Sequence, residues 1–397
     1  MPLSLKKNNL NVLLSESISG ATVRGGQSCS GSDVDFFEAT IDNAAPNWPL
    51  STTPGNMALR TSTYSGQSTS DFYAYYAWGD GTLDSYTNVS NTGTVVHTYA
   101  VQTVYNLRFL TNGTLFYTNS FGQNDRGKFI DIIRWGEKTK WAGVVNGLLG
   151  GTEVTGPLTA TDSIPATFRH VASMFAGTSN FDWSGLNNWD LPGTMVTSLP
   201  NFLDGSTAFN SPVTFDTSNI TNMDYAFQLA TSYDGQGMSG WDVSNVQSFT
   251  QAFTGSNVNV DVSSWDLSSC TNIQYAFQDT PMEGIGTELW DISGISRLDS
   301  CFGGSNFNRN VGVWKFKNSA IAIGMFAPCT SWTDANLALT LEGWDSAGQG
   351  TGVLITLDQR NLSQGTYPNA KTAYDNLVLA TSSGGRGWSI FGITWVP

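Results

Sequence analysis

The sequence is poor in basic residues and in long apolar runs. It has 18 lysines and arginines against 32 aspartates and glutamates among 397 residues, so the formal net charge is −14. Binding to nucleic-acid phosphates or to an anionic membrane requires clustered basic side chains, and the longest basic run is Lys6-Lys7. We therefore expect no nucleic-acid partner. The longest apolar run, around 320–327, is too short to span a bilayer, so we also expect no membrane insertion.

Residue types and motifs that carry catalysis are equally scarce. The only two histidines are His97 and His170, and neither belongs to a His-Glu-x-x-His zinc motif. The sequence contains no Gly-x-Ser-x-Gly nucleophile elbow and no phosphate-binding loop. We therefore expect a non-enzymatic protein without a cofactor. A glycan hydrolase is kept as an alternative, because its two carboxylates can lie far apart in the sequence.

Cysteine is rare and does not form a recognisable pattern. The four cysteines are Cys29, Cys270, Cys301 and Cys329, and none of their spacings is Cys-x-x-Cys. Cys270, Cys301 and Cys329 stand at different positions within the sequence repeats described below, so they do not predict a stacked column of cysteines. We interpret them as buried free thiols. A disulfide between Cys301 and Cys329 is the alternative that the sequence leaves open.

Glycine and aromatic residues, in contrast, are plentiful. The chain has 42 glycines, 12% of its residues are aromatic and only 13% are charged. Disordered chains do not sustain such an aromatic content. This composition predicts a folded protein that is rich in β-structure and loops.

A short motif recurs in the second half of the chain. An aromatic residue opens each copy and a phenylalanine follows 12 residues later. The opening residues are Phe215, Trp241, Trp265, Trp290 and Trp314, and the trailing ones are Phe227, Phe253, Phe277, Phe302 and Phe326. The opening positions are 26, 24, 25 and 24 residues apart, and a less regular copy opens at Trp189, with its trailing position expected at Leu203. So regular a period predicts a repeat protein in which these aromatic residues are structural.

A single repeat predicts one coil of a solenoid of the leucine-rich-repeat type. Val258, Val260 and Val262 alternate as in a short strand, and Trp265 then turns the corner. The spacing from Cys270 to Phe277 predicts one or two helical turns with an apolar stripe. About six such coils, stacked at roughly 4.8 Å, give an array on the order of 30 Å long.

Four copies carry an aspartate directly after the opening aromatic residue: Asp216, Asp242, Asp266 and Asp291. In stacked coils these carboxylates form a column, and unpaired like charges so close together are destabilising. A ladder of calcium ions would neutralise them. Alternatively, each carboxylate accepts hydrogen bonds from its own Asp-x-Ser turn. We favour the turn, and therefore expect no metal site.

The repeats resemble a known family. The hallmark Trp-Asp-Val-Ser-Asn-Val, then Met-x-x-Met-Phe, is matched by Trp241–Phe253 and by Met223–Phe227. Residues 161–165 and 172–177 match the opening of the array in that family. Over about residues 130–330 the chain thus resembles the BspA-type leucine-rich repeats of bacterial surface proteins. The resemblance implies a surface-exposed, adhesive and non-enzymatic protein.

A second resemblance covers the first part of the chain. Residues 72–78 alternate as in a half-buried strand, and Tyr76-Ala77-Trp78 runs into the turn Gly79-Asp80-Gly81. His97-Thr98-Tyr99 and an alternating strand follow. This order is similar to that of PKD-type immunoglobulin-like β-sandwiches, with a shortened Gly-Asp-Gly element, and implies a structural role for His97. Exposed Tyr73, Tyr75 and Tyr86 are candidates for stacking on sugar rings.

The predicted fold is mainly β with short helices, a PKD/Ig-like β-sandwich followed by a leucine-rich-repeat-type solenoid. The predicted segments are an N-terminal arm (1–33), the sandwich (34–120), an N-terminal cap (121–165), the BspA-like repeats (166–335) and a C-terminal cap (336–397). In the last segment we expect a strand near 356–359, a helix near 372–377 and a strand at 387–396. An oligomer contact through Trp388, Phe391 and Trp395 is the alternative to a cap.

These features lead to one functional hypothesis and two alternatives. The first residues lack the apolar core of a secretory signal, whereas both resemblances are to surface domains. A virion-surface structural or attachment protein, such as a head fibre, decoration or tail-associated protein, combines these features. Its arm and sandwich would contact other virion proteins, and its solenoid a glycan or host-surface protein, in a homo-oligomer or multicopy assembly. The alternatives are a bacterial cell-surface adhesin and a glycan hydrolase. We expect binding on residues between the copies, such as 233–236 and 279–280.

Overall fold

The computed structural model describes part of the first half of the chain and nearly all of the second. The described residues are 37–42, 56–59, 61–62, 73–77, 82–87, 95–98, 104–111, 114–115, 129–134, 164, 171–178, 181–191, 196–346 and 349–397. The chain divides into two compact units, residues 1–196 and 197–397. The arm expected at 1–33 and the residues Cys29 and His170 lie outside the described residues.

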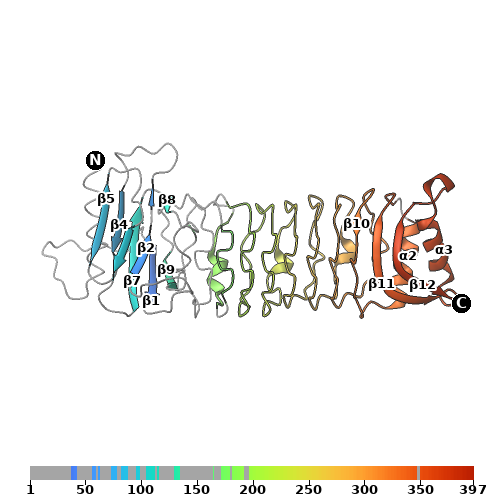
Figure 1. Cartoon of the computed structure of the whole chain (residues 1–397), viewed down its shortest axis with the longest axis horizontal. Coiled ribbons are helices and arrows are strands. Elements are labelled where there is room, and N and C mark those ends of the chain that lie inside the picture. Colours follow the sequence, from blue (N-terminus) through green and yellow to red (C-terminus); the bar gives the residue numbers. More distant parts are fainter. Residues whose placement is uncertain are drawn as a thin grey trace. The chain divides into compact units, whose positions relative to one another are not determined.

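The first unit contains an antiparallel five-stranded sheet of order β5-β4-β7-β1-β9. Its strands are β1 (Phe37–Asp42), β4 (Tyr73–Ala77), β5 (Leu83–Thr87), β7 (Val104–Thr111) and β9 (Phe129–Arg134). Two further antiparallel pairs join β2 (Asn56–Leu59) to β6 (Val95–Thr98) and β3 (Thr61–Ser62) to β8 (Thr114–Leu115). Figure 1 shows these strands in blue and cyan.

The two strands expected on either side of Asp80-Gly81 pair with each other in antiparallel fashion. Strand β4 pairs with β5, with Ala77 opposite Leu83, and the Tyr76 side chain is buried. His97 lies on β6 opposite Met57, and the residues 78–81 that carry the resemblance lie outside the described ones. The PKD-type sandwich therefore stays a prediction. One boundary differs from ours: β9, expected in a cap of the repeats, pairs with β1 and belongs to this sheet.

The second unit is threaded by one parallel ladder. Isolated bridges join Ser198, Asn222, Ser248, Asn272, Arg297 and Ile321 in succession. The ladder then continues from β10 (Ile321–Ala322) to β11 (Leu354–Ser363) and β12 (Ser389–Val396), with Leu354 as the shared residue. We call the chain from one bridge to the next a coil. Each coil thus lies beside the next one along the sequence, as Figure 1 shows for the green-to-orange ribbon.

The internal structure of a coil differs from the one expected. The extended residue that bridges the coils is Asn272, not the valines at 258–262, which form no strand. The helical turns expected around Ile273–Phe277 are also absent there. Tyr275 has a φ of 57°, in the left-handed region, so a right-handed helix cannot pass through it. This bend lets Phe277 N donate to Cys301 O of the next coil at 2.8 Å, so the chain forms turns bonded to the neighbouring coil.

The repeated aromatic residues fill the inside of the coils. All eleven are between 0 and 4% exposed. Trp241, Trp265, Trp290 and Trp314 form one column, with successive ring centroids 6.2, 6.3 and 6.3 Å apart and nearly parallel planes. The five trailing phenylalanines form a second column, with successive centroids 5.7, 5.2, 5.6 and 5.8 Å apart. Leu203 occupies the first trailing position as expected, because its N–H donates to Ala226 O just as Phe227 N donates to Ala252 O.

Buried tryptophan requires a partner for its indole N–H. The Nε1 atoms of these four residues donate to backbone carbonyl groups at 2.8, 3.1, 3.2 and 2.7 Å. The acceptors lie 27 or 28 residues earlier in the chain, so each bond ties a corner to the preceding coil. Short 3₁₀ helices precede three of the tryptophan corners: η3 (Ser184–Asn188), η4 (Met238–Gly240) and η5 (Thr287–Leu289).

The C-terminal segment contains the three elements expected and two more, an α-helix and a short 3₁₀ helix. Strand β11, helix α3 (Pro368–Val378) and strand β12 cover the three predicted positions, and η6 (Thr381–Ser383) follows α3. Helix α2 (Asp334–Ser346) was not expected. Trp344 of α2 and Trp388 both lie with ring centroids 5.2 Å from that of Phe316, so this segment extends the aromatic core. No helix in the described part of the chain is long and apolar enough to cross a membrane.

Candidate functional site

The repeated aspartates lie at an exposed corner and are satisfied within their own turns. The Oδ1 atoms of Asp216, Asp242, Asp266 and Asp291 accept the N–H of the serine two residues later at 2.8, 3.0, 2.9 and 2.9 Å. This is the local Asp-x-Ser turn that the sequence favoured over a calcium ladder. Within the described residues, no group of three or more His, Cys, Asp or Glu side chains is placed to hold a metal ion.

These hydrogen bonds also act on proton binding. The hydroxyl and the N–H of Ser244 lower the pKa of Asp242 below its usual 3.8. The N–H and then the hydroxyl of Ser293 lower the pKa of Asp291 in the same way. The ionised carboxylate is favoured because it is the better hydrogen-bond acceptor. The ionised form of these two carboxylates is therefore stabilised by their own turns, without an ion beside them.

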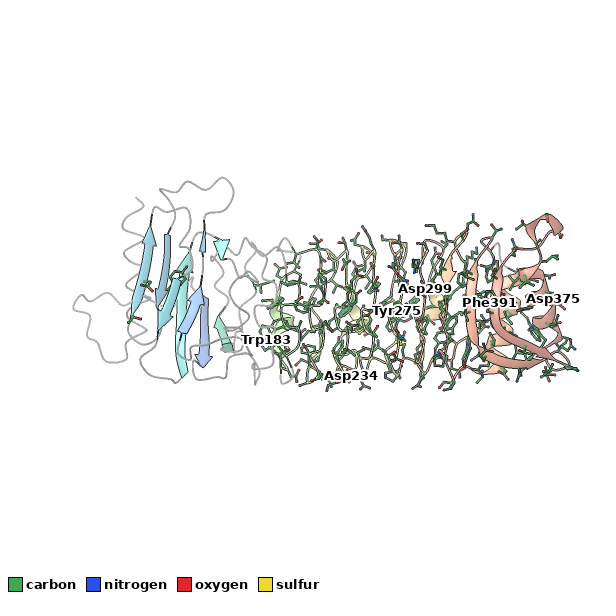
Figure 2. The ribbon with its side chains drawn as sticks, in the orientation of Figure 1. Trp183, Asp234, Tyr275, Asp299, Asp375 and Phe391 are labelled. Atoms are coloured by element: carbon green, nitrogen blue, oxygen red, sulfur yellow. The ribbon has the colours of Figure 1, made fainter. Side chains whose placement is uncertain are left out.

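The segments between the copies, where we expected binding, divide into buried and exposed residues. Tyr233 and Thr280 are 0 and 4% exposed, so the expectation is wrong for these two. Burial raises the pKa of Tyr233 well above 10, and its hydroxyl donates to Gln236 O at 3.2 Å. Asp234 and Gln236 remain accessible. Figure 2 shows Asp234 at one edge of the stack and Tyr275 and Asp299 between its edges.

The accessible inter-copy residues form a column of their own, which we call the variable edge. Its members are Asn210, Asp234, Asn259, Glu283, Asn308 and Thr333. The Oδ1 atoms of the three asparagines accept the backbone N–H of the next member at 3.1, 3.1 and 3.0 Å. Amides thus alternate with Asp234 and Glu283, so no two carboxylates are neighbours, which avoids the repulsion of adjacent like charges.

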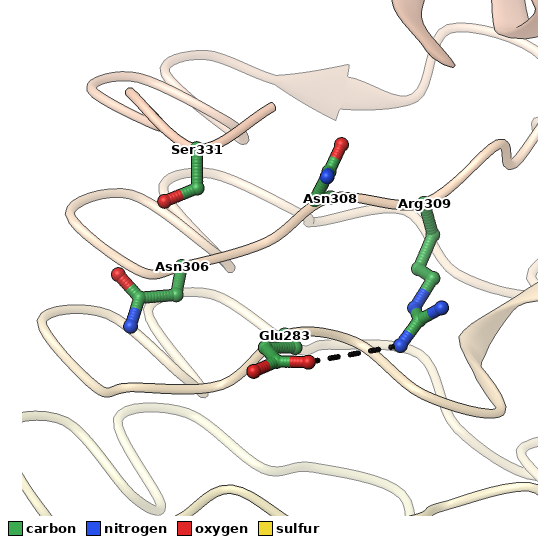
Figure 3. Close-up of a pocket in the computed structure, with 5 residues that line it drawn as sticks. All are labelled: Glu283, Asn306, Asn308, Arg309 and Ser331. Atoms are coloured by element: carbon green, nitrogen blue, oxygen red, sulfur yellow. Dashed lines mark ion pairs between the residues drawn. The ribbon is translucent and has the colours of Figure 1, made fainter. Parts of the chain in front are cut away.

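Two pockets open on the variable edge. One, of about 430 Å³, is lined by Glu283, Asn306, Asn308, Arg309 and Ser331. The other, also of about 430 Å³, is lined by Asp234, Gln236, Asn257, Asn259, Val260 and Pro281. Figure 3 shows the first, with its side chains arriving from successive segments of chain. Each pocket therefore presents one carboxylate and two asparagines.

The first pocket is also lined by a basic side chain, that of Arg309. Arg309 Nη2 lies 3.9 Å from Glu283 Oε2, and both side chains are partly exposed (Figure 3). An ion pair of this kind contributes little to stability. Arg309 also contributes to lowering the pKa of Asp261, after the larger effect of the Ser263 N–H and hydroxyl. The guanidinium is thus placed among oxygen acceptors at the surface and remains accessible from solvent.

The two pockets are related by a period of two coils. Asn257 and Asn259 recur 49 residues later as Asn306 and Asn308. Gly237 and Gly286, also 49 apart, have φ values of 93° and 87° and pack against the backbone of Val213 and Ser263. A side chain at either glycine would clash with that backbone, so these turns require glycine. Each of these glycines is the second of a Gly-x-Gly sequence, at 235–237 and at 284–286. The coil between them has no such sequence, so coils with and without it alternate.

This recurrence identifies residues that our sequence reasoning missed. Asn257, Asn306, Asn308, Arg309 and Ser331 were not among our candidates. Their signal was available, because Asn-x-Asn occurs at 257–259 and again at 306–308. The aromatic motif recurs every 24 to 26 residues, whereas Asn-x-Asn recurs after 49. A prediction based on the shorter period therefore does not include the asparagines.

A second polar network lies on the ladder itself. Asp299, which is 5% exposed, accepts from Arg297 Nε at 2.8 Å and from Gln274 Nε2 at 2.6 Å. Asp224 accepts from Ser248 Oγ at 2.5 Å and from Thr250 N at 2.9 Å. Both carboxylates join neighbouring coils and have their acceptor capacity used inside the fold. This network serves the stack, whereas the variable edge leaves groups free for a ligand.

The cysteines of the repeats are free and buried, as we interpreted them. Cys270, Cys301 and Cys329 form no disulfide, so the alternative bridge between Cys301 and Cys329 is not present. Burial raises the pKa of Cys270 to about 12 and that of Cys329 to about 11. The thiolate, the reactive form, is therefore disfavoured. These residues fill space inside the coils.

Comparison with known proteins bears on the repeat region. Residues 169–285 and 280–347 match a family described as "Mycoplasma protein of unknown function, DUF285". No curated protein and no solved structure matches the chain. The matched residues include every Trp-Asp copy and both pockets of the variable edge. Residues 169–347 are thus similar to this family, and the match supports a BspA-like repeat protein.

Proposed function

We propose that the chain is a non-enzymatic attachment protein whose repeats form a leucine-rich-repeat-type solenoid that presents the variable edge to a surface. The proposal rests on the observation that each coil has two kinds of residues, those that build the stack and those that remain accessible at its surface. The residues that recur from copy to copy are buried aromatics and, in four copies, aspartates whose carboxylates are hydrogen-bonded within their own turns, whereas the accessible pocket residues do not recur in every coil. A constant scaffold with an exchangeable surface suits recognition, as in other stacked-repeat proteins.

We place the protein first on a virion surface, as a head fibre, decoration or tail-associated protein. The N-terminal arm and the sandwich expected from the sequence would contact other virion proteins, and the repeats would contact a glycan or host protein. A homo-oligomer or multicopy assembly fits this setting. The second setting is a bacterial cell surface, where the protein would be an adhesin. The match to a Mycoplasma family favours this alternative.

Locating the protein separates the two settings. Purified particles and washed producer cells would be probed with an antibody against residues 197–397, with and without surface proteolysis. Antibody signal on intact particles supports the virion setting, and signal confined to intact cells supports the adhesin. Neighbouring genes for capsid, portal or tail proteins would agree with the first result. Loss of residues 1–33 is expected to prevent incorporation into particles while the remainder stays folded.

A binding assay tests attachment itself. The purified protein is expected to bind host cells or a glycan array and to leave the bound glycan intact. Release of shortened glycan products would instead favour the third alternative, a glycan hydrolase. Absence of binding to every host surface and every glycan would overturn the attachment function.

A further inference from the structure

We propose that the two pockets of the variable edge form one extended site for a neutral β-1,4-linked glycan, with one two-sugar unit at each pocket. This inference rests on the proposed attachment function and names its ligand class and register. It is carried by the equivalence of the pockets, the chemistry of their lining and the distance between them.

The pockets are copies of one design. Asp234 corresponds to Glu283, Asn257 to Asn306 and Asn259 to Asn308, each pair 49 residues apart. Val260 corresponds in the same way to Arg309, and Ser331 stands one place beyond the equivalent of Pro281. Both pockets have a volume of about 430 Å³. A ligand that fits one pocket thus meets the same carboxylate and amides again two coils later.

The lining offers free donors beside acceptors. The side chains of Asn257 and Asn306 form no hydrogen bond within the described part of the chain, and neither do the Nδ2 atoms of Asn259 and Asn308. The Oδ1 atoms of Asn259 and Asn308, in contrast, are held by the next coil at 3.1 and 3.0 Å. Their amide donors are therefore held in place without being used. An amide N–H₂ and a carboxylate together match the adjacent hydroxyl groups of a sugar, which both accept and donate.

The repeat distance selects an extended chain. Two rungs of a parallel ladder measure about 10 Å, and the pockets are two coils apart. A β-1,4-linked glycan presents the same face at every second sugar, so its repeat is a two-sugar unit of similar length. The hydrogen bonds along the variable edge, at 3.0 and 3.1 Å, keep the two pockets in register, which lowers the entropic cost of binding both units.

Charge excludes the acidic members of this ligand class. The chain has a formal net charge of −14, and each pocket is lined by one of its carboxylates, Asp234 or Glu283. Arg309, the one basic residue among those that line the two pockets, already lies 3.9 Å from Glu283. Like charges repel a polyanion during approach and contact. A neutral chain of N-acetylglucosamine or glucose is therefore the expected ligand.

Titration calorimetry with the full chain tests the site. The probes are the di- and tetrasaccharides of the chito- and cello-oligosaccharide series. In at least one series the tetrasaccharide is expected to bind roughly 100-fold more tightly than the disaccharide, because it occupies both pockets. Asn257→Ala and Asn306→Ala should each reduce tetrasaccharide affinity to that of the disaccharide, and the double variant should abolish binding. Asn369→Ala, an exposed position of α3 without a side-chain hydrogen bond, is the matched control and should bind as the natural protein.

Three results would overturn the inference: no binding in either series, equal affinity for di- and tetrasaccharide, or undiminished binding by the double variant. Binding of the natural protein and the double variant to host cells separates this failure from that of the attachment function. If both bind cells equally well, attachment stands and its site lies elsewhere. If neither binds, attachment fails as well. Asn257 and Asn306 are exposed, and their side chains make no hydrogen bond to any residue that the structure describes. Their variants are therefore expected to unfold at the same denaturant concentration as the natural protein.

Discussion

Two sides of the same coil treat their polar residues in opposite ways. At the Trp-Asp corner, four aspartates use their carboxylates to hold their own turns. In the two pockets that open on the variable edge, Asn257 and Asn306 leave their amides without partners in the described part of the chain. An aromatic corner recurs in each coil and carries one of these aspartates in four of them, whereas the pocket asparagines recur only in every second coil. A repeated motif thus marks what the stack needs for its own folding, and the groups available to a ligand lie where the repeat is broken.

The same contrast separates the two carboxylate columns. The corner aspartates tolerate one another because each receives hydrogen bonds from its own turn. The edge carboxylates Asp234 and Glu283 are kept apart by Asn259, whose Oδ1 accepts the Glu283 N–H at 3.1 Å. At the corner, hydrogen bonds within each turn offset the repulsion between carboxylates. At the variable edge, the alternation of carboxylates with amides keeps the carboxylates apart. Substitutions at the corner should therefore change stability, and those at the edge should change binding.

The largest effect is expected from the aromatic column. Trp290→Ala removes a side chain that is 4% exposed, stacks on Trp265 and Trp314 and donates to Val262 O at 3.2 Å. Loss of a buried tryptophan leaves a cavity, and we expect a destabilisation of about 3–5 kcal/mol. Urea denaturation followed by circular dichroism measures it. A loss below about 1 kcal/mol would mean that neighbouring coils collapse around the gap.

A smaller loss of stability is expected from substitution of a glycine that recurs every second coil. Gly286 has a φ of 87°, and an added Cβ would lie 2.6 Å from Ser263 Cα. Gly286→Ala should destabilise the protein by about 1–3 kcal/mol through backbone strain. Gly240→Ala is the matched control, because an added Cβ there meets nothing within 4 Å and the φ is not positive. Equal denaturation midpoints for the two variants would contradict the steric origin of the period.

At the corner, loss of one turn carboxylate should have a modest effect. Asp242→Ala removes the acceptor of the Ser244 N–H and hydroxyl, at 3.0 and 2.7 Å. By analogy with helix N-caps we expect about 1 kcal/mol, measured by the same denaturation. Ser269→Ala is the control, because Ser269 is an exposed residue of the next corner whose side chain has no hydrogen bond within the described residues. This variant should have the stability of the natural protein. A chelator should leave the melting temperature of the natural protein unchanged; a decrease would instead support calcium at the column.

The smallest effect is a dependence on acid pH. The folded protein lowers the pKa of Asp242 and Asp291 below 3.8, so it binds fewer protons there than the unfolded chain. Their contribution is complete above about pH 4 and is lost as the pH falls through the lowered values. The double variant Asp242→Asn and Asp291→Asn should therefore lose stability less steeply between pH 4 and pH 2, as followed by thermal melts. An identical slope would show that other carboxylates govern the acid limb.

Local chemistry explains what was predictable. The corner depends on contacts within a few residues: the Asp-x-Ser turn is closed by Ser244 and Asp242 alone. The pairing of β4 with β5 on either side of Asp80-Gly81 and the strands and helix of the C-terminal segment follow local propensity in the same way. Helix α2 was missed although its start carries a capping signal. Thr333 Oγ1 accepts the Asn336 N–H at 3.3 Å, which is the side-chain bond typical of a helix start.

The sequence by itself determined the period, the buried aromatic columns and the turn aspartates, because these depend on residue type and on spacing along one coil. Only the tertiary structure decided that the ladder passes through Asn272 rather than the valines at 258–262, because a bridge depends on which residue faces the next coil. Only the tertiary structure brought Asp234 beside Asn257 and Glu283 beside Asn306. These residues are more than 20 positions apart, and stacking of the coils is what makes each pair one pocket.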